Sequence, residues 1–384
     1  MSRTPRRRKA RGRSRVGERF EAVVGPVAHG GHCIVRVTTD PSVEPAETRV
    51  VFTRHAIPGE RVLLEITEGT EGDRFWRGDA VEVLEPSPDR VPAPCRYAGP
   101  GRCGGCDFQH VSLPAQRELK AAVVREQLSR LAHLDVPVVV EPVAGDRDGL
   151  RWRTRVQYAE DEQGRRGMRL HRSRVVIPVD DCLIAREDAR EPSPELVHES
   201  VLGRDFVVSG EGFWQVHPGA PRVLVETVLE QLDPRPGEKV LDLYAGVGLF
   251  AAFLAERVGE RGRVVAVEGS RVACGHARTN LGEFGRAVAV EAGAVDKVLA
   301  TAYDEPFDLV VLDPPREGAR RPVVEQVVDR APRAVAYVAC DPAALARDVA
   351  YFAEHGYALK GLRAFDLFPM THHVECVALL ERPA

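Results

Sequence analysis

The sequence predicts an α/β protein, with a doubly wound Rossmann-like sheet in the C-terminal half and a small β-barrel before it. From about residue 221, short apolar runs alternate with helical segments, as in parallel sheets covered by helices on both faces. Before residue 88, short strand-like runs follow one another with turn residues between them. The chain of 384 residues is 44% hydrophobic, which is enough for two or three domains with their own cores.

Each part of this fold has its own pattern. Barrel strands are expected at residues 20–24, 32–37, 49–52, 61–66 and 80–84. A helix at 113–134 and central antiparallel strands at 151–160, 168–171 and 174–179 follow. Parallel strands are expected at 240–243, 264–267, 309–312 and 334–338, and a last strand-like run at 373–380. We therefore expect a tail (1–15), a barrel (16–87), a central α+β domain (88–205) and a C-terminal domain (206–384).

The charge of the chain is unevenly distributed. The formal net charge is −4, yet residues 1–15 hold eight basic residues and no acidic one. The rest of the chain then carries 45 basic and 57 acidic residues, a formal charge of −12. A basic arm gains affinity for nucleic acid through phosphate contacts, although a disordered, solubilising tail has the same composition.

The chain lacks the sequence features of a membrane or secreted protein. No apolar run approaches the roughly 18 residues that cross a bilayer. The basic N-terminus is not followed by the apolar segment of a secretory signal. We therefore expect a cytoplasmic protein without a membrane partner, in which the eight cysteines serve metal binding or catalysis rather than disulfides.

A methyl-donor site is expected at the ends of the parallel strands. The strand from residue 240 breaks into a turn with Gly246 and Gly248, where the backbone can approach a ligand closely. About 20 residues later Glu268 can bind both hydroxyls of a ribose, which a dinucleotide site would also require. The third strand ends at Asp313-Pro-Pro, which is common in enzymes that use S-adenosylmethionine and not in NAD enzymes. The three features in this order predict S-adenosylmethionine as the cofactor.

The next residues indicate that the methyl acceptor is a carbon atom. Arg316 stands where enzymes that methylate exocyclic amines usually have an aromatic residue. Cys340 ends another strand, just before a helix opened by Pro342, whose amide dipoles favour a thiolate. Because C5 of uracil is a weak nucleophile, a thiolate that adds to C6 activates it. The C5 proton must then leave, and Glu375 is the candidate base.

Five motifs occur in one order along the chain, and together they resemble the bacterial RNA uracil-5 methyltransferases. The resemblance, which runs from about Val16 onward, is to the branch that carries a TRAM domain and an iron–sulfur cluster. It implies Cys340 as the nucleophile, Glu375 as the proton acceptor, and donor binding by Gln215, Tyr244, Glu268 and Asp313. The motifs are Phe213-Trp-Gln215, Asp242-Leu-Tyr-Ala-Gly-Val-Gly248, Asp313-Pro-Pro-Arg316, Val338-Ala-Cys-Asp-Pro342 and Phe368-Pro-Met-Thr-His-His-Val-Glu375.

Two residues depart from the family pattern. Leu249 stands where the family often has Asn, so a donor contact there is restricted to the backbone. Asp341 replaces the usual Asn after the nucleophile. A second anion beside Cys340 opposes thiolate formation unless that anion is paired.

Four cysteines form a candidate metal site. Cys95, Cys103 and Cys106 lie in one segment, and Cys182 follows the central strands. Four thiolates suit either a structural zinc ion or a [4Fe-4S] cluster, and the spacing leaves both open. The family resemblance implies the iron–sulfur cluster, although the gap after Cys95 is longer than the family's usual one.

These features predict an enzyme that methylates C5 of uracil in structured RNA. The resemblance favours 23S ribosomal RNA, because barrel and cluster occur together, and transfer RNA is the alternative. Cytosine-5 methylation uses the same covalent chemistry, but its cysteine follows a proline, whereas Ala339 precedes Cys340. A non-catalytic RNA-binding protein would fit the barrel but not the retained donor site and nucleophile. We expect a monomer.

Overall fold

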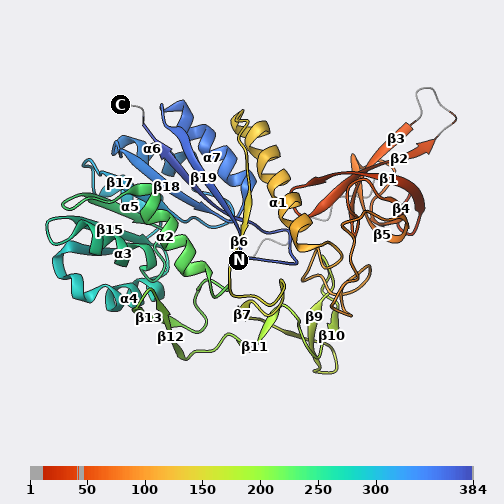
Figure 1. Ribbon diagram of the computed structural model, residues 1–384, viewed down its shortest axis with the longest axis horizontal. Helices are drawn as coiled ribbons and strands as arrows, with labels where there is room; N and C mark the ends of the chain where they lie inside the picture. Colours follow the sequence, from red (N-terminus) through yellow and green to blue (C-terminus); the bar gives the residue numbers. More distant parts are fainter. Residues whose placement is uncertain (1–11, 41, 43–46, 383–384) are drawn as a thin grey trace. The chain divides into compact units, whose positions relative to one another are not determined.

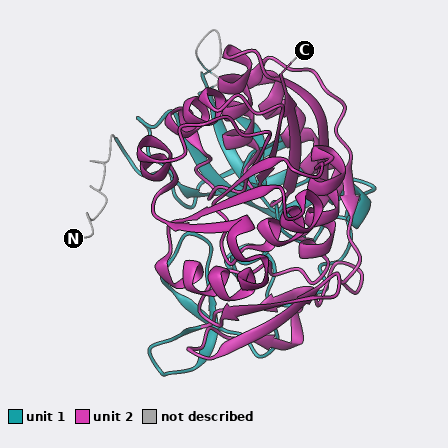
Figure 2. Cartoon of the chain, turned by 90° about the vertical axis from the view of Figure 1, so that its left-hand side faces the viewer, with its two compact units in different colours: residues 1–116, 159–182, 370–372 teal, residues 117–158, 183–369, 373–384 magenta. Residues whose placement is uncertain are grey.

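The computed structural model describes residues 12–40, 42 and 47–382, and its contacts divide the chain into two compact units (Figure 2). Unit 1 comprises residues 1–116, 159–182 and 370–372, as far as they are described. Unit 2 comprises residues 117–158, 183–369 and 373–384, again as far as they are described. Most of the basic tail lies outside the described residues. Arg15, one of the tail residues that the structure describes, forms ion pairs with Glu18 (2.9 Å) and Glu71 (3.1 Å).

The first part of unit 1 is a closed five-stranded barrel with strand order β1-β2-β3-β5-β4. Alternate residues of each strand point inward, and the core includes fully buried Val35, Val62 and Leu64. All five strands expected from the sequence are present and join in one barrel, which confirms that prediction. They are β1 (Arg19–Ala28), β2 (His32–Asp40), β3 (Glu47–Arg54), β4 (Arg61–Glu68) and β5 (Phe75–Glu85).

The rest of unit 1 is a small antiparallel sheet of order β10-β9-β8 and a cysteine-containing segment. Its strands are β8 (Ala159–Glu160), β9 (Arg166–Arg169) and β10 (Val176–Pro178). An isolated bridge pairs Cys103 with Leu170, and the amide of Gly104 donates to the carbonyl of Arg169 (3.0 Å). The cysteine segment is therefore fixed to the end of β9.

The prediction of a single strand at residues 151–160 is wrong, because this segment forms two strands that belong to different sheets. β7 (Arg153–Arg155) pairs in parallel with β11 (Ala185–Arg190) in unit 2, whereas β8 belongs to unit 1. The amide of Thr154 donates to Val216 (2.8 Å) and that of Val156 to Arg190 (2.9 Å). These distant partners take the backbone groups that a continuous hairpin would have used.

Unit 2 contains an eight-stranded sheet of order β16-β15-β14-β17-β18-β20-β19-β6. Figure 1 labels five of its strands, namely β15, β17, β18, β19 and β6. The strands from β16 to β18 run parallel, and β20 is antiparallel to both of its neighbours. The sequence analysis missed β6, β16 and β19. The strands are β6 (Val140–Pro142), β14 (Lys239–Leu243), β15 (Arg263–Glu268), β16 (Val288–Ala292), β17 (Leu309–Leu312), β18 (Ala334–Ala339), β19 (Ala358–Asp366) and β20 (Glu375–Glu381).

Helices cover both faces of this sheet, as the doubly wound prediction requires. One core contains Leu241 of β14 and side chains of α1, α5, α6 and α7; the other contains Val240 and side chains of α2, α3 and α4. Alternate strand residues thus enter opposite cores. The helices are α1 (Leu113–Gln127), α2 (Ala220–Leu232), α3 (Leu249–Val258), α4 (Arg271–Asn280), α5 (Val295–Thr301), α6 (Arg320–Asp329) and α7 (Pro342–Glu354).

Within the described residues, no helix is both long and apolar enough to span a membrane. The hairpin of β12 (Leu196–Val201) and β13 (Arg204–Ser209) precedes α2. The parallel strands β14, β15, β17 and β18 all end at the same edge of the sheet. That edge is where doubly wound proteins bind ligands.

Candidate active site

The turn after β14 has the conformation that a close ligand contact requires. Tyr244, Gly246 and Gly248 all have positive φ angles, of 65°, 56° and 89°. A Cβ on Gly248 would lie 2.7 Å from a methyl carbon of Leu281, whereas a Cβ on Gly246 would meet no atom within 4 Å. Gly248 is thus required by packing, and Gly246 faces open space. Leu249 then begins α3 and is buried, so it presents only its backbone.

Glu268 ends β15 and holds this turn in place. One of its carboxylate oxygens accepts from the amide of Gly246 (2.9 Å) and the other from the amide of Ser270 (2.6 Å). Each carboxylate oxygen has a second lone pair, so Glu268 can still accept hydroxyl groups of a ligand. The expected carboxylate and the glycine turn therefore lie together.

Asp242 is a buried carboxylate that the sequence analysis did not select. Its Oδ2 accepts from the amide of Ala251 (2.8 Å), whereas its Oδ1 has no hydrogen-bond partner within the described part of the chain. Burial, together with the charges of Asp313 and Glu268, raises the pKa of Asp242 to about 7. The sequence signal that could have identified Asp242 is an ionisable residue within an otherwise apolar strand.

The other expected donor-site residues lie near the same strand ends or in the segment before α2. The amide of Asp313 donates to the carbonyl of Leu243 (3.2 Å), which fixes the end of β17 beside the end of β14. Burial raises the pKa of Asp313 to about 7 and that of Tyr244 to about 12. Gln215 is buried in the segment between β13 and α2.

Cys340 and Glu375 face each other across two neighbouring strands. In the antiparallel pair of β18 and β20, Ala339 lies opposite Cys376. Extending this register by one residue places Cys340 opposite Glu375, the first residue of β20. Cys340 is partly exposed, whereas Glu375 is buried. Two residues that are 35 positions apart in the sequence are thus brought together by one strand pair.

In the free protein, the other surroundings of Cys340 oppose the thiolate that the helix dipole was expected to favour. Burial raises the pKa of the Cys340 thiol to about 12, and the carboxylates of Glu375, Asp313 and Asp341 add to this increase. Burial and Asp313 likewise raise the pKa of Glu375 well above its usual value.

Arg316 carries the positive charge that opposes the effect of these carboxylates on Cys340 and Glu375. It lowers the pKa values of both Cys340 and Glu375, although by less than burial raises them. One guanidinium nitrogen lies 3.2 Å from Nε2 of His373. Because a guanidinium only donates, Nε2 of His373 is the acceptor of this hydrogen bond.

Asp341 has a structural role at the start of α7. Its Oδ1 accepts from the amide of Ala344 (2.8 Å), so it is the N-cap of this helix. An N-cap contact stabilises the carboxylate but leaves its negative charge beside Cys340. The substitution of the family's Asn by Asp therefore raises the pKa of the neighbouring thiol.

The four cysteines of the candidate metal site all belong to unit 1 and form no disulfide. Burial raises the pKa of Cys103, and the nearby thiols of Cys95 and Cys182 raise it further. The amide of Gly105 donates to Sγ of Cys103 (3.4 Å), and the side chain of Gln109 donates to Sγ of Cys106 (3.4 Å). Within the described ranges, however, no group of three or more His, Cys, Asp or Glu side chains is arranged to hold a metal ion.

Two protein families match parts of the chain. The methyltransferase small domain matches residues 220–337, and the tRNA (Uracil-5-)-methyltransferase family matches residues 295–383. A crystal structure of the Pyrococcus abyssi tRNA (uracil-54, C5)-methyltransferase in complex with S-adenosyl-L-homocysteine superposes with a TM-score of 0.68. It covers 94% of this chain and 99% of that one at 20% identity, and so shows a shared fold.

Similar sequences cover nearly the whole chain. An RNA methyltransferase of Streptomyces avermitilis is 46% identical, with 96% of this chain and 99% of the relative aligned. The 23S rRNA (uracil(1939)-C(5))-methyltransferase of Halomonas elongata is 31% identical over 95% of this chain and 90% of its own length. The enzyme of the same name from Pseudomonas fluorescens is 30% identical over 95% of each chain. The chain therefore belongs to the family of RNA uracil-C5 methyltransferases, which depend on S-adenosylmethionine.

Proposed function

We propose that the protein transfers a methyl group from S-adenosylmethionine to C5 of a uridine in RNA, with 23S ribosomal RNA as the substrate. The relatives named for this activity support the substrate. The observation that carries the proposal is the register of β18 and β20, which places a thiol and a carboxyl group opposite each other. Both groups are electrostatically coupled to Asp313 at the end of β17.

The residues at the strand ends fit the donor. The turn at Gly246 faces open space, and the buried Oδ1 of Asp242 has no partner among the described residues, so both can receive a ligand. We assign donor binding to Glu268 for the ribose, to Gly246 and Gly248 for the close backbone approach, and to Gln215, Tyr244 and Asp313. When bound, S-adenosylmethionine supplies an electrophilic methyl group on a positively charged sulfur.

The protein's own groups then act on the pyrimidine in two steps. The thiolate of Cys340 forms a bond to C6, and the electron pair of the C5–C6 double bond becomes available at C5. C5 then takes the methyl group, the sulfur–methyl bond of the donor breaks, and S-adenosylhomocysteine leaves. Glu375 next removes the proton from C5, the double bond re-forms, and the bond between sulfur and C6 breaks. The overall reaction releases one proton, which leaves through Glu375.

Both groups must be ionised at the right moment, although burial opposes this in the free protein. Arg316 is the charged side chain that favours the ionised forms of Cys340 and Glu375. We assign His373 the role of holding Arg316, because its Nε2 accepts from the guanidinium. Cys340 and Glu375 are the catalytic residues of this proposal, and His373 is a positioning residue.

We propose that unit 1 binds the RNA substrate. We assign the barrel as a TRAM domain, and we assign Cys95, Cys103, Cys106 and Cys182 as ligands of a [4Fe-4S] cluster. The electrostatic coupling of these thiols and the N–H donors to Cys103 and Cys106 support the cluster, because such donors are usual around iron–sulfur centres. The protein would work as a cytoplasmic monomer with a tail, a barrel, a central domain and a methyltransferase domain.

Mapping 5-methyluridine by mass spectrometry in ribosomal and transfer RNA from a deletion strain tests the proposed function. One site in 23S RNA should lose its methyl group and regain it on complementation. Loss at a transfer RNA site instead would favour the substrate after which the matched family is named. In vitro, a transcript containing 5-fluorouridine should form a gel-stable adduct with the protein, because fluorine cannot leave C5 as a proton does. If the correct RNA forms no adduct, covalent catalysis by Cys340 is wrong.

A further inference from the structure

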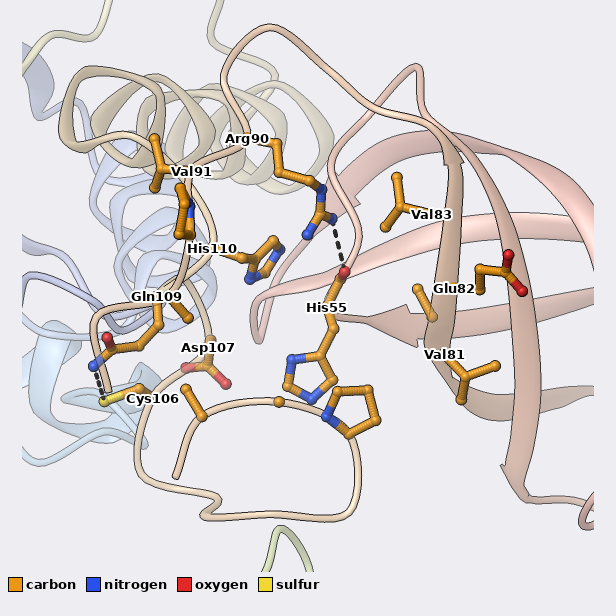
Figure 3. A pocket seen from close by; sticks show the side chains of 16 residues that line it. His55, Val81, Glu82, Val83, Arg90, Val91, Cys106, Asp107, Gln109 and His110 are labelled. Atoms are coloured by element: carbon orange, nitrogen blue, oxygen red, sulfur yellow. Dashed lines mark hydrogen bonds between the residues drawn. The ribbon is translucent and has the colours of Figure 1, made fainter. Parts of the chain in front are cut away.

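Unit 1 contains a cavity of about 530 Å³ that the proposed reaction does not use (Figure 3). Strand β5 bounds it on one side, and the segments 90–93, 98–100 and 106–110 bound the other. Figure 3 shows His55 entering from the end of β3 and Asp107 and His110 from the segment after the cysteines. The volume is within the range of small-ligand sites.

Arg90 and Asp107, two charged residues that line this cavity, have partners in unit 1, whereas Glu82 lines it as an exposed carboxylate. Arg90 pairs with buried Glu60 at 2.5 Å. Asp107 lies 2.6 Å from Nδ1 of His372 and 3.5 Å from the guanidinium of Arg54. A phosphate would therefore find no unpaired positive charge among these groups.

Uncharged polar atoms remain available. Nε2 of His55 and Oε1 of Gln109 are buried and have no hydrogen-bond partner among the described residues, and Gln109 itself is only 3% exposed. Burial lowers the pKa of His55 to about 3 and that of His110 to about 4, and nearby arginines add to both decreases. Both imidazoles are consequently neutral at physiological pH, when each ring offers one donor and one acceptor.

The backbone fixes the position of the His55 ring. His55 has a φ angle of 62°, which is uncommon for a residue with a side chain. Its carbonyl accepts from the guanidinium of Arg90 (2.9 Å), which in turn is held by Glu60 (2.7 Å). A strained conformation that surrounding contacts maintain is typical of positions that present a group to a ligand.

The cavity wall between Nε2 of His55 and Oε1 of Gln109 is largely apolar. Val81 and Val83 of β5, and Pro92, Ala93 and Ala98 of the facing segments, line the cavity. An apolar cleft with a few neutral hydrogen-bonding groups suits a flat, uncharged heterocycle. Proteins recognise single-stranded RNA through bases of this kind, which leave the stack and are bound by their edges.

We propose that this cavity binds one unpaired nucleobase of the RNA substrate, distinct from the uracil that is methylated. The inference rests on the proposed function for the identity of the polymer as RNA. The apolar wall contacts the faces of the base, and His55 and Gln109 bind its edge. Unit 1 thereby selects the substrate by the position of a second unpaired nucleotide.

Filling the cavity tests this proposal. Ala93 is exposed and lines the cavity, so Ala93→Trp can occupy it with little effect on folding. We expect Ala93→Trp to raise the Kd for a 23S RNA fragment about tenfold, the usual effect of losing one base contact. Val23→Trp is the matched control, because Val23 is 63% exposed on β1 and does not line the cavity. Equal affinity of both variants would overturn the proposal.

A second variant avoids dependence on the added tryptophan. His55→Asn shortens the side chain but keeps a residue that tolerates the left-handed conformation. It should raise the Kd for the RNA fragment severalfold, while the thermal unfolding midpoint changes by less than about 2 °C. An unchanged Kd in a folded His55→Asn protein would exclude recognition of the base by His55.

Crosslinking identifies the ligand and separates this inference from the proposed function. Ultraviolet light should link full-length protein to 23S RNA through a peptide from residues 80–110, and Ala93→Trp should abolish that adduct. Mononucleotides at the same base concentration should give much less of it, because they lack the rest of the RNA. Mononucleotides that crosslink as well as RNA would instead assign a free-nucleotide site. These readouts need no methylation, so they stand even if no 5-methyluridine is formed.

Discussion

The two units hold their chemical groups in different ways. In unit 2, Cys340, Glu375 and Asp313 lie at the ends of buried strands, and the sheet register fixes their positions. In unit 1, the cysteine segment contains no long strand or helix among its described residues. Single hydrogen bonds hold the cysteine segment in place. For example, the amide of Cys103 donates to the carbonyl of Tyr97 (2.9 Å). A site at strand ends tolerates changes of individual side chains, whereas a site in a loop depends on each contact.

The largest effect is expected at the nucleophile of unit 2. Cys340→Ala should lower methyl transfer by at least about 10³-fold, because no other group can activate the pyrimidine. The Kd for RNA should change less than about twofold, since Cys340 lies beyond the last paired residue of β18, Ala339. Cys376→Ala, one position from Glu375, is the control for a buried thiol outside the reaction. Residual turnover of several per cent in Cys340→Ala would contradict the assignment.

Glu375→Gln separates the two steps of the same site. The amide cannot take the C5 proton, so the protein should remain bonded to an RNA that already carries the methyl group. Denaturing gels and mass spectrometry of the adduct measure this. A variant that is inactive without accumulating adduct would place the base elsewhere.

The next effect concerns the stability of unit 2. Lys120 of α1 and Asp366 of β19 form a buried ion pair at 2.5 Å, with side-chain exposures of 1% and 2%. Lys120→Met should lower the free energy of unfolding by about 3 kcal/mol, because it leaves a buried charge without its partner. The double variant Lys120→Met/Asp366→Leu should recover most of this loss in denaturant titrations. Equal destabilisation by the single and double variants would show that packing, not charge, is responsible.

Unit 1 should respond to the loss of one thiol. Cys103→Ala should abolish the brown colour and most of the iron of anaerobically purified protein, because the proposed cluster needs four ligands. Cys33→Ala, in the barrel, is the control for a buried cysteine outside the segment. A colourless wild-type protein with one equivalent of zinc would contradict the cluster and indicate a structural zinc ion, the other centre that the cysteine spacing allows.

The smallest effect is expected at Asp341. Asp341→Asn keeps a good helix N-cap but removes one of the anions that raise the pKa of Cys340. A lower pKa means more thiolate at a given pH, so alkylation of Cys340 at pH 8 should be about threefold faster. The rate in either protein should rise with pH, because the pKa of about 12 lies above the range tested. Peptide mass spectrometry follows Cys340, and a slower rate in Asp341→Asn would contradict the charge argument.

The sequence predicts the regular parts of both units well, because their patterns are local. The five barrel strands and β14, β15, β17 and β18 follow from alternation and buried runs. The site residues Glu268, Asp313 and Cys340 follow from their positions at strand ends. The roles of these residues remain predictions, since position alone does not measure chemistry.

What the sequence could not provide depends on contacts between distant residues. The division of residues 151–160 between two sheets follows from partners at Val216 and Arg190. The high pKa of Cys340 follows first from its burial and then from carboxylates that the fold brings to it from two other segments. The cavity beside His55 has no local pattern, because its two walls come from β5 and from the segments around the cysteines.

The place of β20 in the sheet has a consequence for biosynthesis. β20 is the last strand in chain order, yet it lies between β18 and β19 rather than at an edge. While the ribosome is still making residues 375–381, β18 and β19 lack the strand that lies between them in the finished protein. A nascent chain therefore completes its sheet in the same event that brings Glu375 opposite Cys340. Under the proposed function, a chain that has not yet paired β20 holds the nucleophile Cys340 without the base Glu375 opposite it.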